Sequence, residues 1–262
     1  MKTHVFTILT LVITGIYAAS AVAAGDDEAA ESLVFPESYK ARSVSNGGTI
    51  TGTVTFEGEA PAMKKLEITK NPEVCGVTEK FDESVVVGEG NGLKNTIIYL
   101  MDISSGAGFP KGAKVKHQID QKGCQFNPHV NLIPVGKRLT MLNPDKIMHN
   151  VHIFSKENAP YNKSQPGSRR KMPVKAVKKA EGPVAVKCDV HGWMKAWIAY
   201  IPHPYFAVSD ENGQYKLENV PPGTYKLGYW HEAFGTNTES PASVTVDAGG
   251  AATKDFALSP KN

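Results

Sequence analysis

Residues 188–194 read Cys-Asp-Val-His-Gly-Trp-Met, and they lie between a strand-like run that ends at Lys187 and another that begins at Trp193. A thiol, an imidazole and a thioether therefore occur at the spacing C-x2-H-x2-M on one tight turn. A soft thiolate, imidazole and a weak thioether are the ligand types of a mononuclear blue-copper site, which also needs a second histidine. Because a short turn cannot surround an ion, that histidine must come from elsewhere in the chain.

His149 is the best-placed second histidine. It opens a strand-like run in the segment 143–154, which reads Asn-Pro-Asp-Lys-Ile-Met-His-Asn-Val-His-Ile-Phe. His152 competes with it for this role. Side chains alternate between the two faces of a strand, so His152 falls on the face opposite to His149. We therefore rank His152 well below His149.

The composition favours a turn-rich, all-β protein. The chain has 262 residues, of which 41% are hydrophobic and 21% charged, with 24 glycines and 17 prolines. That length allows one large domain or two modest ones, and it is enough to bury a core. The formal net charge of +3 is too small to indicate general nucleic-acid binding. Because almost no segment shows sustained helical periodicity, we expect a β-sandwich architecture.

The predicted strands follow from runs of β-branched and alternating residues. An Asn-Gly pair at 212–213 predicts a hairpin turn within 207–217. Residues 156–183 are rich in lysine and arginine and predict a long surface connection with one helical turn at 174–180. The other expected strands are 48–56, 85–87, 96–100, 114–119, 130–135, 139–142, 150–154, 184–187, 193–201, 224–230, 242–246 and 253–258.

The first 24 residues have the pattern of a cleaved signal peptide. Lys2 and His4 precede an apolar run, and small residues follow it up to Ala24. An uncleaved N-terminal anchor is the alternative. We expect a flexible leader at 25–47, no later membrane span, and a periplasmic or secreted protein in an oxidising compartment.

The sequence resembles cupredoxins of the plastocyanin and amicyanin kind over about residues 115–202. Three segments carry the resemblance: 126–136, 136–154 with His-Asn-Val at 149–151, and the ligand loop 188–194. The spacing of the loop matches amicyanin, whereas plastocyanins have two more residues before the methionine. The resemblance implies one copper ion per chain, cycling between Cu+ and Cu2+. It also implies the ligands His149, Cys188, His191 and Met194, with Met194 as the weak axial ligand.

The resemblance also suggests roles for residues around these ligands. Asn150 would brace the ligand loop through hydrogen bonds, as outer partners of metal ligands do. We expect Trp193 to shield the site from water. In cupredoxins the histidine of the ligand loop reaches the surface and serves as the electron port, which here falls on His191.

The three cysteines fit the same interpretation. An oxidising compartment favours a disulfide between Cys75 and Cys124, which leaves Cys188 for the metal. Two separate buried thiols are the alternative. A second metal site at Cys124 and His129 lacks a third ligand at a useful spacing. A binuclear copper site needs two cysteines in the ligand loop, and only one is present.

A second resemblance covers the flanks of the copper segment. Residues 49–54, 95–100 and 208–227 look like the carboxypeptidase regulatory-like (transthyretin-like) β-sandwich. The fold expected is therefore a Greek-key cupredoxin sandwich combined with a split transthyretin-like sandwich. The expected boundaries are 1–24 for the signal peptide, 25–47 for the leader, 48–113 and 205–262 for the two parts of the split sandwich, and 114–204 for the cupredoxin domain.

Three functions are consistent with this sequence. The first is a carrier of single electrons, not an enzyme, with redox partners such as c-type cytochromes or a dehydrogenase or oxidase. The basic segment 163–179 could steer an acidic partner. The second is a copper-handling or storage protein. The third is an enzyme with an open copper position, as in a red-copper relative. His203, His231 and Glu232 could form a polar site in the flanks, although a structural role is favoured.

Overall fold

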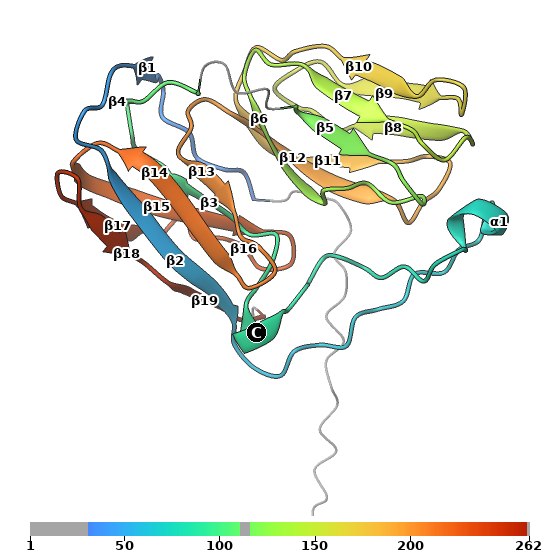
Figure 1. Cartoon of the computed structure of the whole chain (residues 1–262), viewed down its shortest axis with the longest axis horizontal. Helices are drawn as coiled ribbons and strands as arrows, with labels where there is room; N and C mark the ends of the chain where they lie inside the picture. Colours follow the sequence, from blue (N-terminus) through green and yellow to red (C-terminus); the bar gives the residue numbers. More distant parts are fainter. Residues whose placement is uncertain (1–30, 111–115, 261–262) are drawn as a thin grey trace, which may run out of the picture.

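The regular secondary structure of the described residues is almost entirely β-strand, arranged in two sandwiches that lie side by side (Figure 1). The computed structural model describes residues 31–110 and 116–260. The predicted signal peptide, residues 25–30 of the predicted leader and residues 114–115 of the predicted strand 114–119 lie outside this range. No helix within the described residues has the length and hydropathy needed to cross a bilayer.

The first sandwich uses only strands between residues 118 and 201, and it carries the candidate metal ligands. One sheet has the order β6-β12-β11-β8-β9, and the facing sheet has the order β10-β7-β5. The strands are β5 (Gln118–Asp120), β6 (Val130–Pro134), β7 (Leu139–Leu142), β8 (His149–Ile153), β9 (Tyr161–Gln165), β10 (Lys171–Val174), β11 (Glu181–Lys187) and β12 (Lys195–Ile201).

The second sandwich takes its strands from both sides of the first in sequence. One sheet has the order β13-β3-β15-β16 with β17 also paired to β15, and the other has the order β14-β2-β18 with β19 also paired to β2. The strands are β2 (Gly48–Phe56), β3 (Ile97–Leu100), β13 (Phe206–Val208), β14 (Gln214–Val220), β15 (Gly223–His231), β16 (Gly235–Thr236), β17 (Ala242–Val246), β18 (Ala251–Thr253) and β19 (Phe256–Leu258). A small parallel pair, β1 (Lys40–Ala41) and β4 (Ser105–Gly106), lies beside it.

The two sandwiches pack face to face, and the alternation of strand side chains explains how. On β12, Ala196 and Ile198 enter the core of the first sandwich, whereas Trp197 and Ala199 point the opposite way into a third core between the sandwiches. Since strand residues alternate between faces, a strand that is apolar on both faces must be covered on both. Trp197 there meets Trp230 of β15, with ring centroids 5.2 Å apart. Within the described residues, the two sandwiches therefore stack four sheets around three cores, and the small β1–β4 pair lies outside this stack.

Three local predictions from the sequence were wrong. Residues 85–87 form no strand but only a single bridge, between Val87 and Leu93. Residues 156–183 are not a single surface connection: they contain β9, which pairs with β8, and β10, which pairs with β7, and residues 174–180 contain no helical turn. The strands around Asn212-Gly213 do not pair as a hairpin: β13 joins β3, and β14 joins β2. The turn there is tight, but it carries the chain from one sheet to the other.

One long excursion leaves the second sandwich and reaches the first. Between β2 and β3 the chain runs out as two antiparallel arms, held by bonds from Leu66 N–H to Lys80 O and from Asp82 N–H to Lys64 O. Between the arms lies the short helix α1 (Pro72–Cys75), which Figure 1 shows in cyan beneath the right-hand sandwich. We call residues 64–82 the strap. It is followed by the 3-10 helix η1 (Glu89–Asn91) near the second sandwich.

Candidate metal centre

Three of the four expected ligands lie together at one end of the first sandwich. His149 begins β8, and Cys188 and His191 stand on the turn from β11 to β12, which is a neighbouring part of the same sheet. Their ligand atoms all lie within 4.8 Å of one another, and all three residues are buried. The Nδ1 atoms of the two histidines are 3.1 Å apart, and Cys188 Sγ lies 3.7 Å from His191 Nδ1.

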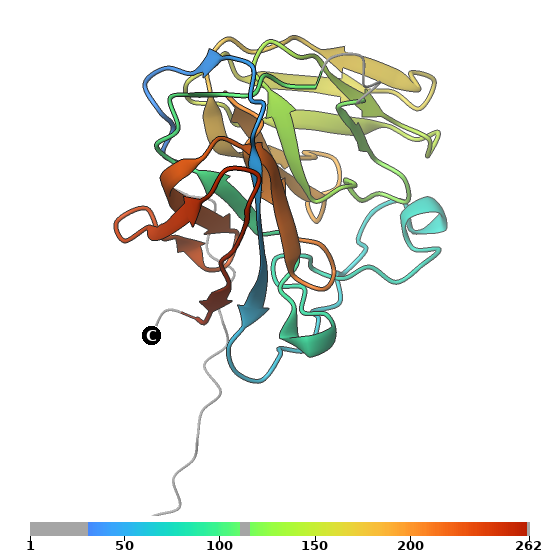
Figure 2. The same cartoon turned by 60° about the vertical axis from the view of Figure 1, so that its left-hand side comes forward.

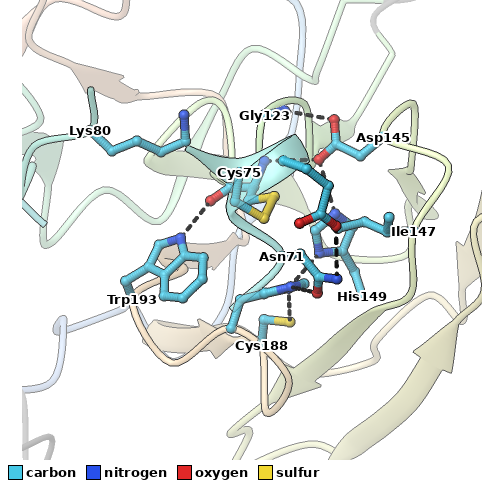
Figure 3. The surroundings of a disulfide bond; sticks show 12 residues. Asn71, Cys75, Lys80, Gly123, Asp145, Ile147, His149, Cys188 and Trp193 are labelled. Atoms are coloured by element: carbon cyan, nitrogen blue, oxygen red, sulfur yellow. Dashed lines mark hydrogen bonds and ion pairs between the residues drawn. A yellow bond between two sulfur atoms is a disulfide. The ribbon is translucent and has the colours of Figure 1, made fainter. Parts of the chain in front are cut away.

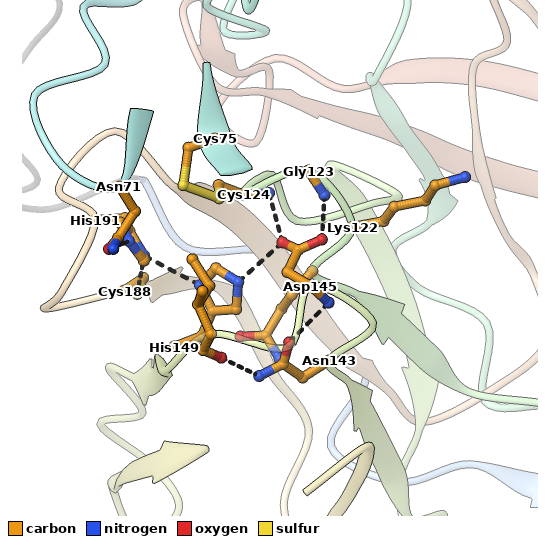
Figure 4. A network of polar contacts seen from close by, with 12 residues as sticks. Asn71, Cys75, Lys122, Gly123, Cys124, Asn143, Asp145, His149, Cys188 and His191 are labelled. Atoms are coloured by element: carbon orange, nitrogen blue, oxygen red, sulfur yellow. Dashed lines mark hydrogen bonds and ion pairs between the residues drawn. A yellow bond between two sulfur atoms is a disulfide. The ribbon is translucent and has the colours of Figure 1, made fainter. Parts of the chain in front are cut away.

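The outer nitrogens of both rings have oxygen partners. His149 Nε2 lies 3.0 Å from Asp145 Oδ2, and His191 Nε2 lies 3.0 Å from Asn71 Oδ1 (Figure 4). Because both oxygens only accept hydrogen bonds, each Nε2 donates and each Nδ1 directs its lone pair inward. An outer oxygen partner of this kind is typical of histidines that bind metal.

The donor atoms therefore fit a metal ion held by nitrogen and sulfur. Two tetrahedral ligands that each lie about 2.0 Å from one ion are about 3.3 Å from each other, close to the spacing of the two Nδ1 atoms. Without an ion, two lone pairs at this distance would repel, so one of the two Nδ1 atoms must carry a proton and donate it to the other. Burial opposes charge on His149, but its hydrogen bonds to Asp145 and Cys188 prevail and raise its pKa. Burial and the nearby His149 lower the pKa of His191 to about 4.

The thiol of Cys188 is prepared to act as a thiolate. Burial alone would raise its pKa, but hydrogen bonds from the His149 ring and from backbone N–H groups lower it. One of these donors is the N–H of Asn150, 3.2 Å from Sγ. Since the thiolate is the form that binds metal, the surroundings favour the reactive form of this cysteine.

Met194 closes the ligand loop. Its N–H donates to His191 O over 2.9 Å, and its carbonyl accepts from Cys188 N–H over 3.3 Å. The side chain is 1% exposed and lies in the same hydrophobic cluster as Cys188. A buried thioether in the same core cluster as the thiolate suits a weak axial ligand.

Asn150 and Trp193 also lie against the site. The side-chain oxygen of Asn150 accepts from Asp189 N–H over 3.2 Å, so that Asn150 bonds to the ligand loop through both backbone and side chain. The Trp193 ring lies 5.1 Å from the His191 ring. Its Nε1 donates to Cys124 O over 3.0 Å, as Figure 3 shows.

The expectation that His191 reaches the surface was wrong. His191 is 0% exposed, because the strap lies over the edge where an electron port would open. Asn71, which covers this nitrogen, and Asp145 are the two functional neighbours that the sequence analysis missed. Asp145 stands in the quoted segment 143–154, four residues before His149, and its carboxylate could have been considered there. Asn71 has no such signal.

Cys75 and Cys124 form a disulfide in this structure, and Cys188 is a free thiol. The disulfide is buried and joins the strap to the turn after β5 (Figure 3). The alternative of two separate thiols does not apply to this structure.

The other four histidines that the sequence analysis considered have partners outside the group of donor atoms. His152 points to the other face of β8, where it bonds to Asp189 and stacks on Phe154 with centroids 3.8 Å apart. His129 pairs with Glu232 over 2.6 Å instead of joining Cys124. His231 stacks on Phe234, and His203 is enclosed by aromatic rings. His203 and His231 therefore lie against aromatic rings, whereas Glu232 forms ion pairs with His129 and Lys195.

Comparison with known proteins gives partial likenesses. A family model described as "Polysaccharide lyase family 4, domain II" matches residues 178–254, which run from the end of the first sandwich into the second. No curated protein matches the sequence.

Among solved structures the chain is similar to cupredoxins over less than half its length. An oxidised amicyanin variant is 15% identical with a TM-score of 0.30, over 46% of this chain and 94% of that one. A purple cupredoxin from Nitrosopumilus maritimus is 17% identical with a TM-score of 0.28, over 33% of this chain and 100% of that one.

A copper-containing nitrite reductase from Thermus scotoductus SA-01 is 20% identical with a TM-score of 0.30, over 35% of this chain. The chain spans only 24% of that reductase's length. The case for the metal centre therefore depends on its own donor atoms.

Proposed function

We propose that the chain is an exported type 1 copper protein that carries single electrons through a site made of His149, Cys188, His191 and Met194. One observation carries the proposal. Two imidazole Nδ1 atoms face each other at 3.1 Å beside a cysteine whose surroundings favour the thiolate, while each outer Nε2 already has a partner.

Copper bound there would supply a one-electron couple between Cu(I) and Cu(II). The task of the protein is to hold soft and nitrogen ligands in one arrangement that both oxidation states accept. All four side chains are buried, and hydrogen bonds fix both rings and the thiolate. Little movement is therefore needed when the charge of the site changes.

The partners we propose are redox proteins of the periplasm or the extracellular space, such as c-type cytochromes or a dehydrogenase or oxidase. The basic segment 163–179 presents exposed cations along β9, the following turn and β10. Such a surface raises the rate of encounter with an acidic partner at low ionic strength. The second sandwich would act as support without catalysis.

A copper-handling protein is the second candidate, and the covered His191 is the observation that favours it. A histidine that is 0% exposed beneath the strap suits retention of an ion. An enzyme with an open copper position is less well supported, because Met194 is buried and Trp193 packs against His191. Binding of azide to the Cu(II) form would favour the enzyme.

The visible absorption spectrum of the copper-loaded protein tests the proposal. We expect an intense thiolate-to-copper band that Cys188→Ser abolishes. His152→Ala is the matched control, because His152 stands on β8 as His149 does but faces away from the donors. A colourless copper-loaded protein would contradict a type 1 site. Metal transfer without electron exchange with any cytochrome would favour the second candidate.

A further inference from the structure

The side-chain oxygen of Asn71 is the outer partner of His191, although the two residues belong to different parts of the chain. They are separated by 120 positions, and Asn71 Oδ1 lies 3.0 Å from His191 Nε2. An oxygen at this distance requires the proton on Nε2 and leaves Nδ1 free to bind metal. Asn71 thus has the geometry to select the tautomer that the site needs.

The backbone holds Asn71 firmly in this place. It stands at the N-cap of α1 with φ 51° and ψ 50°, in the left-handed region that asparagine tolerates better than most residues. Its carbonyl accepts hydrogen bonds from Val74 N–H and Cys75 N–H, over 3.0 and 2.8 Å. The side chain makes no capping hydrogen bond. Its oxygen faces His191, and its Nδ2 donates to Glu73 Oε1 over 3.4 Å.

Two further attachments hold the strap over the site. The Cys75–Cys124 disulfide ties it to the turn after β5, and both cysteines offer sulfur atoms within 4.8 Å of a His191 nitrogen. Ile68 and Val74 of the strap pack against the core of the first sandwich. On its outer side the strap is open to solvent, where Val77 is 76% exposed.

We propose that the strap is a tethered cover for the His191 edge of the site and that Asn71 is the positioning residue through which it acts. Asn71 holds the His191 ring in its metal-binding tautomer. Metal enters and leaves along this edge only when the strap lifts, and the disulfide limits how often it does. This proposal rests on the proposed copper site, but it concerns the strap and not the electron transfer.

A purely structural strap is the competing explanation. In that case Asn71 would be present only because asparagine adopts the left-handed backbone conformation at low cost, and the disulfide would only stabilise the fold. The two explanations differ in what happens when the amide is removed but the backbone conformation is kept.

Asn71→Gly makes that change, because glycine adopts a positive φ without strain. Asn91→Gly is the matched control: Asn91 has φ 61° and lies in η1, away from the ligands. Asn71→Asp is the rescue variant, because it keeps a side-chain oxygen acceptor.

The first measurement uses the metal-free protein and the 15N signals of its histidines. In wild type, Asn91→Gly and Asn71→Asp we expect the Nε2–H tautomer of His191. In Asn71→Gly we expect a mixture of tautomers. An unchanged His191 signal in Asn71→Gly would overturn the positioning role.

The second measurement is the rate at which the Cu(I)-loaded protein loses metal to a chromogenic Cu(I) chelator. Loss of an outer partner of a ligand costs roughly 10–100-fold in metal affinity, so we expect release at least about tenfold faster from Asn71→Gly. The double variant Cys75→Ser/Cys124→Ser should also release faster. Release rates within twofold of the wild-type rate for both variants would overturn the proposal that the strap covers the site.

Failure of the proposed copper function can be distinguished from failure of the proposed strap function. A wild-type protein without the thiolate-to-copper band would contradict the proposed function, whereas the tautomer of His191 is measured without metal.

Discussion

Asp145 Oδ2 lies 3.0 Å from His149 Nε2, and the same carboxylate accepts hydrogen bonds from the N–H groups of Gly123 and Cys124 over 2.7 and 2.8 Å. One side chain thus orients a candidate ligand and fixes the turn that carries the disulfide. Asp145→Asn removes the charge that supports His149. We expect Cu(I) affinity to fall by about 10–100-fold, as for other outer partners of metal ligands.

Competition with a Cu(I) chelator measures this affinity. Asp189→Asn is the matched control. Asp189 pairs with His152, which lies on the same strand as His149 but on the opposite face. In the metal-free protein, NMR titration should show a lower pKa for His149 in Asp145→Asn, since the bond to Asp145 helps to raise it. Equal affinities for the two variants would contradict the role of Asp145.

Met194→Leu tests the axial position. Leucine has a similar volume, so the buried site should keep its packing with a loss of less than about 1.5 kcal/mol in unfolding free energy. The axial ligand tunes the reduction potential of such a site. Because leucine donates no electron pair to the more electron-poor Cu(II) state, the potential should rise while the visible band remains. Voltammetry of the loaded variant measures the shift. An unchanged potential would mean that Met194 is not a ligand.

The Cys75–Cys124 disulfide closes a loop with a sequence separation of 49 residues. A loop of this length predicts a loss of about 4 kcal/mol in unfolding free energy when the bridge is removed. Denaturant unfolding of the metal-free Cys75→Ser/Cys124→Ser variant measures the loss. Wild-type protein unfolded with a reductant should match the variant. A loss below about 1 kcal/mol would show that the strap is stable on its own contacts.

The donor residues could be predicted from the sequence because their pattern is local. The C-x2-H-x2-M spacing places Cys188, His191 and Met194 on one turn, and strand alternation separates His149 from His152. The two-faced burial of β12 also follows from its uninterrupted apolar run. These features depend on neighbours a few residues apart.

The cover of the site could not be predicted in this way. Asn71 meets His191 across 120 positions, and nothing in residues 64–82 indicates which sandwich they contact. The turn at Asn212-Gly213 was misjudged for a related reason. A tight turn limits the local path of the chain but does not decide how the flanking strands pair. Here β13 pairs with β3, and β14 pairs with β2, a longer strand.

The pairing of Glu232 with His129 and Lys195 gives a prediction about acid stability. Burial alone would raise the pKa of Glu232, but His129 and Lys195 outweigh it and lower the pKa to about 2, from an ordinary value of 4.5. A carboxyl group whose pKa is lower in the folded protein stabilises the fold at pH values above its pKa in the unfolded chain. This stabilisation is lost as the pH falls through its pKa in the folded protein. The contribution is about 3 kcal/mol at pH 6, and less than half of it remains at about pH 3.

Glu232→Gln should therefore be less stable than wild type at pH 6, and the difference in unfolding free energy should shrink steadily between about pH 4.5 and pH 3. Glu218→Gln is the control, because Glu218 pairs with Lys216 on the surface, where both side chains are more than half exposed. It should change stability by less than about 1 kcal/mol. Glu232 follows β15 of the second sandwich, whereas His129 and Lys195 belong to the first, so these ion pairs join the two sandwiches. If the difference in unfolding free energy between Glu232→Gln and wild type did not vary with pH, packing alone would join the two sandwiches.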